Sequence, residues 1–134
     1  MIVKQNEFVE FKFDKLILYI TIIKNIEPTN DEFNFTITTM NSFYEAAKLG
    51  NYKFSIIFDI KNLAILPKNL YNKWANYFKE NRKNTKLYIH KTAIICINQI
   101  AKATLNVFFK MYKSERPVSI VSSIADAITF AASN

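Results

Sequence analysis

The chain alternates between two hydrophobic patterns: short apolar runs, and longer stretches in which apolar residues recur every three or four positions. Residues 8–13 partly alternate apolar and charged side chains, and residues 16–23 form a β-branched and aromatic run. Runs of this kind are typical of strands. With Asp14 and Lys15 between them, they predict an antiparallel hairpin, and Pro28 ends its second strand.

A helix is predicted directly after this hairpin. Thr29 and Glu32 have the spacing of a capping box, in which each residue satisfies the backbone N–H of the other. Apolar side chains then recur at helical spacing until Gly50, the only glycine, which is a natural stop. The face expected to be buried consists of Phe33, Ile37, Met40, Tyr44 and Ala47.

Three further strands are expected. The first two are nearly continuous apolar runs of the kind that is buried on both faces in a parallel sheet, and the third is a short last strand. They lie at residues 52–60, at residues 92–97 with a start as early as Leu87, and at residues 118–121. The first of them ends at Asp59.

A helix is predicted after each of these strands. The first follows Pro67 and frays at residues 81–84, the second is capped by Asn98, and the third opens with the capping-box spacing of Ser123 and Asp126. The side chains expected to face inward are, in chain order, Leu70, Trp74, Tyr77 and Phe78; Ile100, Val107, Phe108, Met111 and Tyr112; and Ile124, Ala127, Ile128 and Ala131.

The resulting order ββαβαβαβα predicts one α/β domain over residues 1–134. Its sheet is expected to have five strands and to be mostly parallel, with an antiparallel N-terminal hairpin strand. Right-handed crossovers that never reverse direction would place every helix on one face of the sheet. The other face would then need a partner.

Composition indicates the kind of compartment, partner and genome that this chain fits. Half of the residues are hydrophobic, and the single Cys96 lies in an apolar run, which fits a reducing compartment. The net charge of +7 comes mostly from lysines scattered along the sequence, so nucleic-acid binding is a weaker hypothesis than a solvated surface. The abundance of Lys, Asn, Ile, Phe and Tyr is typical of an AT-rich genome.

No targeting or membrane-spanning segment is expected. Charged residues interrupt the first thirteen positions, unlike a signal peptide. The longest apolar stretch, residues 16–23, is far shorter than the about 20 residues that span a bilayer. We therefore expect a cytoplasmic protein.

The second half of the chain resembles the STAS-like family, relatives of bacterial anti-sigma-factor antagonists that are grouped with CRAL-TRIO-type folds. The resemblance rests on a strand ending in Asp59, the strand at residues 92–95, and the segments 107–109, 116–121 and 126–130. It covers roughly residues 8–131. Versions rich in lysine and asparagine are common in AT-rich bacteria, protists and large DNA viruses.

The resemblance implies a binding module rather than an enzyme. Regulatory members carry a phosphorylated Ser or Thr in the loop after the central strand. Here that stretch, residues 59–67, contains no Ser, Thr or Gly. The phospho-switch is therefore not expected in this chain.

Catalytic and metal sites are not expected. The only histidine, His90, lies six residues from Cys96, and on an extended run this separation is about 20 Å, too far for a shared nucleophilic site. Cys96 is best interpreted as a small buried hydrophobe, and His90 as exposed or at a strand edge. One glycine excludes Gly-rich phosphate loops, so no cofactor is predicted.

The best candidate site is a polar rim beyond the carboxyl ends of the parallel strands, where α/β proteins bind ligands. The same residue types are also common helix caps and turn formers, and that interpretation stays open. The rim residues are Asp59, Lys61, Asn62, Asn98, Gln99, Ser122 and Ser123.

Aromatic residues are the other unusual feature, with 12 Phe and 7 Tyr. They predict either a well-filled core or an apolar groove or dimer face. We therefore expect a non-enzymatic protein-protein interaction module that forms a homodimer. The alternative is a carrier of a small apolar or lipid ligand, which requires an apolar cavity between the first helix and the sheet.

Overall fold

In the computed structural model, which describes residues 1–63 and 68–134, the chain folds as a six-stranded mixed sheet with five helices. The strands are β1 (Ile2–Gln5), β2 (Val9–Asp14), β3 (Ile17–Ile22), β4 (Phe54–Asp59), β5 (Ile89–Ile95) and β6 (Val118–Val121). The helices are α1 (Asn30–Gly50), α2 (Lys68–Glu80), α3 (Arg82–Tyr88), α4 (Gln99–Met111) and α5 (Ile124–Ala132). The predicted α/β class is confirmed.

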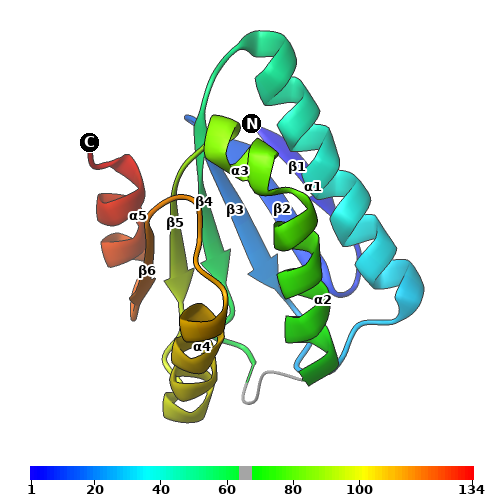
Figure 1. Cartoon of the computed structure of the whole chain (residues 1–134). Helices are drawn as coiled ribbons and strands as arrows, with labels where there is room; N and C mark the ends of the chain where they lie inside the picture. The colour runs from blue at the N-terminus through cyan, green and yellow to red at the C-terminus, as the bar shows by residue number, and fades with distance from the viewer. Residues whose placement is uncertain (64–67) are drawn as a thin grey trace.

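The strands lie side by side in chain order, from β1 to β6. The pairs β1–β2 and β2–β3 are antiparallel, and β3, β4, β5 and β6 are parallel to one another. Because the order never reverses, the crossover helices α1 to α4 lie on one side of the sheet, while α5 returns to the other side (Figure 1). The predicted hairpin and parallel half are confirmed.

The prediction of five strands is wrong, because β1 adds a sixth at the edge of the sheet. Residues Ile2 to Gln5 are all exposed, so the strand has no buried alternating face that sequence patterning could detect. It forms by pairing with β2, where Val3 lies opposite Lys12. Backbone pairing that depends on a neighbouring strand leaves little trace in the sequence.

The hairpin turn between β2 and β3 lies one residue later than predicted and consists of Lys15 and Leu16. Both have left-handed backbones, with φ of 51° and 62°. Two-residue hairpins favour this geometry, but residues other than Gly, Asn and Asp adopt it at a cost. Leu16 is 51% exposed, so little packing offsets that cost.

Replacing Lys15 and Leu16 by Asn and Gly is expected to raise the free energy of unfolding by about 1–2 kcal/mol, because both new residues tolerate positive φ. Urea unfolding followed by the fluorescence of the only tryptophan, Trp74, measures this change. Leu16→Ala is the control, since alanine keeps the backbone cost and should give no gain. A double variant no more stable than the native chain would contradict the prediction.

The N-terminus of α1 confirms the predicted capping box. The Glu32 N–H donates to the Thr29 hydroxyl at 3.1 Å, and the Thr29 N–H donates to the Glu32 carboxylate at 2.9 Å. This backbone donor lowers the pKa of Glu32, and the Lys24 ammonium, 3.1 Å from the carboxylate, contributes further. The structure therefore fixes the start of α1 as the sequence predicts.

The end of α1 corrects the role of Gly50. Gly50 is the last helical residue, and the left-handed cap is Asn51 with φ of 54°. A Cβ on Gly50 would lie 2.7 Å from the ring of Tyr52. Glycine is needed here for close approach of an aromatic ring and not for a left-handed turn.

Aromatic rings fill the space between α1 and the sheet. Phe43 of α1 stacks on Phe11 at 6.2 Å and on Phe13 at 5.5 Å between ring centroids. Phe54 meets Phe13 edge-on at 5.9 Å, and Tyr44 packs against Phe54 at 6.1 Å. This part of the aromatic surplus is core, and close aromatic packing occupies the space between Phe43 of α1 and β2, where the carrier hypothesis expects an apolar cavity.

Three other helix predictions need correction. Residues 82–88 form the short helix α3 instead of a frayed end, so β5 begins at Ile89. In α4, Ile100 and Val107 are exposed, because the buried face consists of Ala101, Leu105, Phe108 and Tyr112. In α5, Ile124 and Ile128 are exposed and only Ala127 and Ala131 are buried. The predicted roles of Pro67 and of the Met111 side chain lie outside what the structure describes.

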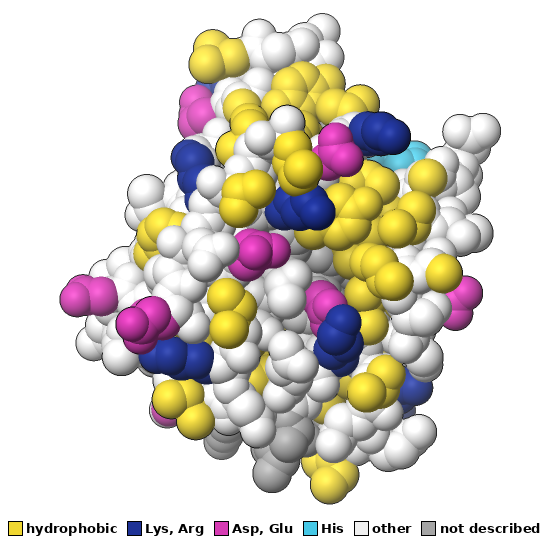
Figure 2. All heavy atoms as spheres, turned by 180° about the vertical axis from the view of Figure 1, so that it is seen from behind, with side chains coloured by type: hydrophobic (Ala, Val, Ile, Leu, Met, Phe, Trp, Pro, Cys, Tyr) yellow, Lys and Arg dark blue, Asp and Glu magenta, His cyan; other side chains and the backbone are white. Residues whose placement is uncertain are grey.

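The second face of the sheet is covered in two different ways. Over β4 and β5, α5 packs through Ala127 and Ala131 onto Ile57 and Ala93. The same face of β1 and β2 carries the polar side chains Gln5, Glu10, Lys12 and Asp14, none of them buried. Figure 2 shows this face as a mixture of hydrophobic and charged side chains. The prediction of a partner on this face assumed that no helix covers it and that it is apolar, and neither assumption holds.

Among the described helices, none has the length and apolar character needed to cross a membrane.

Candidate functional site

The predicted rim residues lie beyond the carboxyl ends of the strands, as expected, but most of their side chains make contacts that stabilise the fold. Asp59 ends β4, and its carboxylate accepts from the Lys61 N–H and pairs with the Lys61 ammonium, both at 3.1 Å. The Asn62 amide donates to the Ile22 carbonyl at 3.4 Å, which ties the loop after β4 to the end of β3. These three residues are used within their own loop.

The remaining rim residues are helix caps and their neighbours. The Asn98 side chain accepts from the N–H groups of Ile100 and Ala101, and that of Ser123 accepts from the N–H of Asp126. Ser122 accepts from the Lys102 ammonium at 3.2 Å, which joins the end of β6 to α4, and Gln99 is exposed. The interpretation as caps and turn formers accounts for this rim.

His90 and Cys96 lie in separate surroundings. The His90 ring contacts the Ser133 carbonyl at 2.7 Å, whereas Cys96 is buried with its sulfur 3.7 Å from the Asn98 carbonyl. Burial raises the pKa of the Cys96 thiol, which makes it a poor nucleophile. In the part of the chain that the structure describes, no three His, Cys, Asp or Glu side chains gather as metal ligands do.

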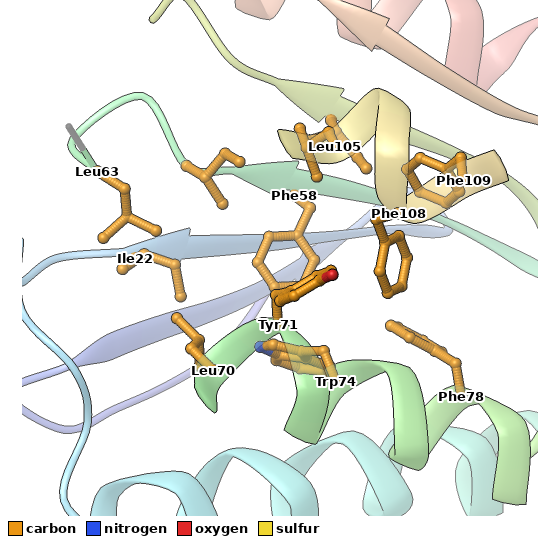
Figure 3. A pocket seen from close by; sticks show the side chains of 12 residues that line it. Ile22, Phe58, Leu63, Leu70, Tyr71, Trp74, Phe78, Leu105, Phe108 and Phe109 are labelled. Atoms are coloured by element: carbon orange, nitrogen blue, oxygen red, sulfur yellow. The ribbon is translucent and has the colours of Figure 1, made fainter. Parts of the chain in front are cut away.

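One hollow of the helical side is an apolar groove between α2 and α4, here called the α2–α4 groove. It has a volume of about 90 Å³, and every side chain that lines it is apolar or aromatic (Figure 3). The lining residues are Leu70, Tyr71, Trp74 and Phe78 of α2; Leu105, Phe108 and Phe109 of α4; and Ile22, Phe58, Ile60, Leu63 and Ile94 from the strands and the loop after β4.

The amphipathic pattern of the two helices forms this groove. Trp74 packs edge-on against Phe58 at 5.1 Å and stacks on Phe78 at 5.4 Å, which fixes the α2 wall to the sheet. Across the groove, Tyr71 of α2 meets Phe108 of α4 edge-on at 5.4 Å. The helices are thus held apart by aromatic contacts that leave an apolar hollow between them.

A second hollow, of about 60 Å³, lies beneath α4 and shares Phe58, Phe78, Ile94, Phe108 and Phe109 with the groove. It reaches the buried hydroxyls of Tyr44 and Thr85, which lie 3.2 Å apart and form a hydrogen bond. The packing under α4 is therefore looser than the aromatic packing under α1.

An exposed apolar stripe runs along α4 on its solvent side. Ile100, Ala103 and Val107, here called the α4 ridge, are spaced three and four residues apart and are all exposed. Ile100 and Val107 are 61% and 52% exposed, and Ile97, just before the helix, is 55% exposed. The same helix thus lines the groove with one side and presents hydrophobic side chains to solvent with the other.

The groove and the ridge together form the candidate site. The aromatic residues predicted an apolar groove as one possibility, but its place between α2 and α4 and the ridge itself were not predicted. The sequence signal was present: residues 99–111 carry apolar side chains around most of the helix, more than one buried face requires. The hydrophobic spacing predicted that Ile100 and Val107 are buried, so the exposed ridge was not predicted.

No protein-family model, curated protein or solved structure matches this chain.

Proposed function

We propose that this chain is a non-enzymatic protein-binding module that receives a hydrophobic helix of a partner on the α4 ridge and the α2–α4 groove. The observation that carries the proposal is the exposed apolar spacing of Ile100, Ala103 and Val107 beside an apolar groove. Spacings of three and four residues match the seam of a second helix, which recognises such surfaces through residues at i, i+3 or i+4, and i+7.

The size of the groove supports a side-chain anchor. Its volume of about 90 Å³ is smaller than the roughly 150 Å³ of a cavity that holds benzene, and far below the roughly 300 Å³ or more of sites for drug-sized ligands. One aliphatic side chain from a partner, entering beside the contact between Tyr71 and Phe108, fits this scale.

A STAS-like relationship is part of the proposal. It is supported by Asp59 at the end of β4 and by the run of four parallel strands. A binding module that lacks the phospho-switch is the function that this resemblance implies, since residues 60–67 contain no Ser, Thr or Gly.

The second candidate function is a carrier of a small apolar ligand, which the wholly apolar lining favours. Ligand entry would require α4 to move away from α2 and to join the two hollows that share Phe58 and Phe108. Native mass spectrometry distinguishes the two functions, because a carrier purified from its host retains a bound small molecule. The same measurement tests the predicted homodimer against the monomer mass of 15.6 kDa.

Replacing Ile100 and Val107 by Ser is expected to abolish partner binding and leave the fold intact, because both side chains are more than half exposed. The measurement is an affinity pull-down from the native host with the native chain and the double variant. A protein that both chains retain equally would contradict the proposed site.

The matched control is Ile2→Ser with Val3→Ser in β1, which removes two side chains of similar exposure, 51% and 52%, from a distant edge. This control should retain the partner. Thermal unfolding of both double variants should lie close to that of the native chain, since surface changes usually shift stability by about 0.5 kcal/mol or less.

A further inference from the structure

We infer that the helix received by the α4 ridge and the α2–α4 groove is acidic. This inference rests on the proposed function and adds the chemistry of the partner. It follows from the uneven division of charge along the chain and from the two lysines of α4, which no carboxylate of the described residues pairs with.

Although the lysines form no long run, basic residues are more frequent in one segment of the chain than in the rest. Residues 68–116 contain eleven of the 18 basic residues but only two of the 11 acidic ones, Glu80 and Glu115. The rest of the chain has more acidic than basic residues. This segment contains α2, α3 and α4, which lie on the helical side of the sheet (Figure 1). It also contains β5, whose Lys91 lies over the Phe130 ring of α5 on the other face.

This charge is scarcely neutralised within the chain. Of the ion pairs found among the described residues, only Arg82–Glu115, at 3.8 Å, joins two residues of this segment. On α4, Lys102 donates to the neutral hydroxyl of Ser122, and Lys110 is exposed. Neither lysine of α4 is therefore paired with a carboxylate in the part of the chain that the structure describes, so both can pair with acidic residues of a partner.

Charge also argues against a second copy as the occupant. A two-fold pairing of α4 ridges would bring together two surfaces that each carry Lys102 and Lys110 and no acidic residue of α4. An acidic helix removes this repulsion and supplies hydrophobic side chains at matching spacing. A nucleic acid would satisfy the lysines but would leave the ridge and the apolar groove unused.

The test uses two synthetic amphipathic peptides with the same leucine and phenylalanine positions, one with glutamate and one with lysine on the polar face. Fluorescence anisotropy with the full chain should show at least tenfold tighter binding of the glutamate peptide, and this preference should shrink as salt rises. Lys102→Gln with Lys110→Gln should weaken glutamate-peptide binding by about two- to fivefold per lysine.

Lys4→Gln with Lys12→Gln is the matched control for lost charge and should leave binding unchanged, since both residues lie in β1 and β2. Equal affinity for the two peptides, or no binding of the glutamate peptide, would overturn the acidic inference. Tighter binding of single-stranded DNA or of anionic vesicles would also overturn it. A different result would contradict the proposed function itself: a host partner that the variant with Ser at positions 100 and 107 still retains.

Discussion

Replacing Phe11 by Ala is expected to lower the free energy of unfolding by about 3–5 kcal/mol, the usual loss when a buried aromatic ring is deleted. Phe11 is fully buried, stacks on Phe43 at 6.2 Å, and meets Phe35 edge-on at 6.4 Å. The substitution leaves a cavity between α1 and β2 where aromatic rings otherwise fill the space. For a domain of this size, that loss is a large part of the whole stability of about 5–15 kcal/mol.

Urea unfolding followed by Trp74 fluorescence measures this loss, because the tryptophan lies in α2 and reports on the same core. Lys12→Ala is the control: the neighbouring residue points to the other face of the sheet, and its loss should cost about 0.5 kcal/mol or less. A loss below about 1 kcal/mol for Phe11→Ala would mean that α1 does not pack on β2 as described.

The second large effect is expected at high pH, where buried tyrosines oppose ionisation. Burial raises the pKa of Tyr44 to about 12 from an ordinary value of 10.0, and it also raises the pKa of Tyr77. Below pH 10 both the folded and the unfolded chain keep these protons. Between pH 10 and 12 the unfolded chain loses its proton first, so stability falls as pH rises, by roughly 3 kcal/mol for Tyr44 alone.

Urea unfolding at a series of pH values from neutral to strongly alkaline measures this decline. Tyr44→Phe is the matched variant. It loses the hydrogen bond to Thr85 and so starts less stable, but its stability should fall less steeply above pH 10. Phenolate absorbance should show the same behaviour, with Tyr44 and Tyr77 ionising only as the chain unfolds. An alkaline decline that is identical in the two chains would exclude Tyr44 as its source.

Predictions that rest on local chemistry agree well with the structure. Thr29 and Glu32 form their capping box, Asn98 and Ser123 cap α4 and α5, and the apolar run after residue 52 becomes β4. Each of these features depends on residues within a few positions of one another. Their physical causes are therefore present in the sequence before any tertiary contact forms.

Predictions of which face of a helix or strand is buried were less successful. Residues 99–111 offer several apolar faces, and only packing against α2 and the sheet decides that Phe108 is buried and Ile100 is exposed. The strand β1 likewise exists because β2 offers it an edge. The place of the candidate site was not predicted for this reason. A groove depends on how two helices pack against each other, and the sequence of either helix alone does not show it.

The α/β class, the order of most elements and their caps could be predicted from the sequence, because they follow from side-chain periodicity, local hydrogen bonding and composition. Contacts between distant segments were needed to show that α5 crosses to the second face of the sheet, that aromatic rings close the space under α1, and that α2 and α4 remain apart. Those outcomes depend on which surfaces meet, and close packing between distant segments settles that choice.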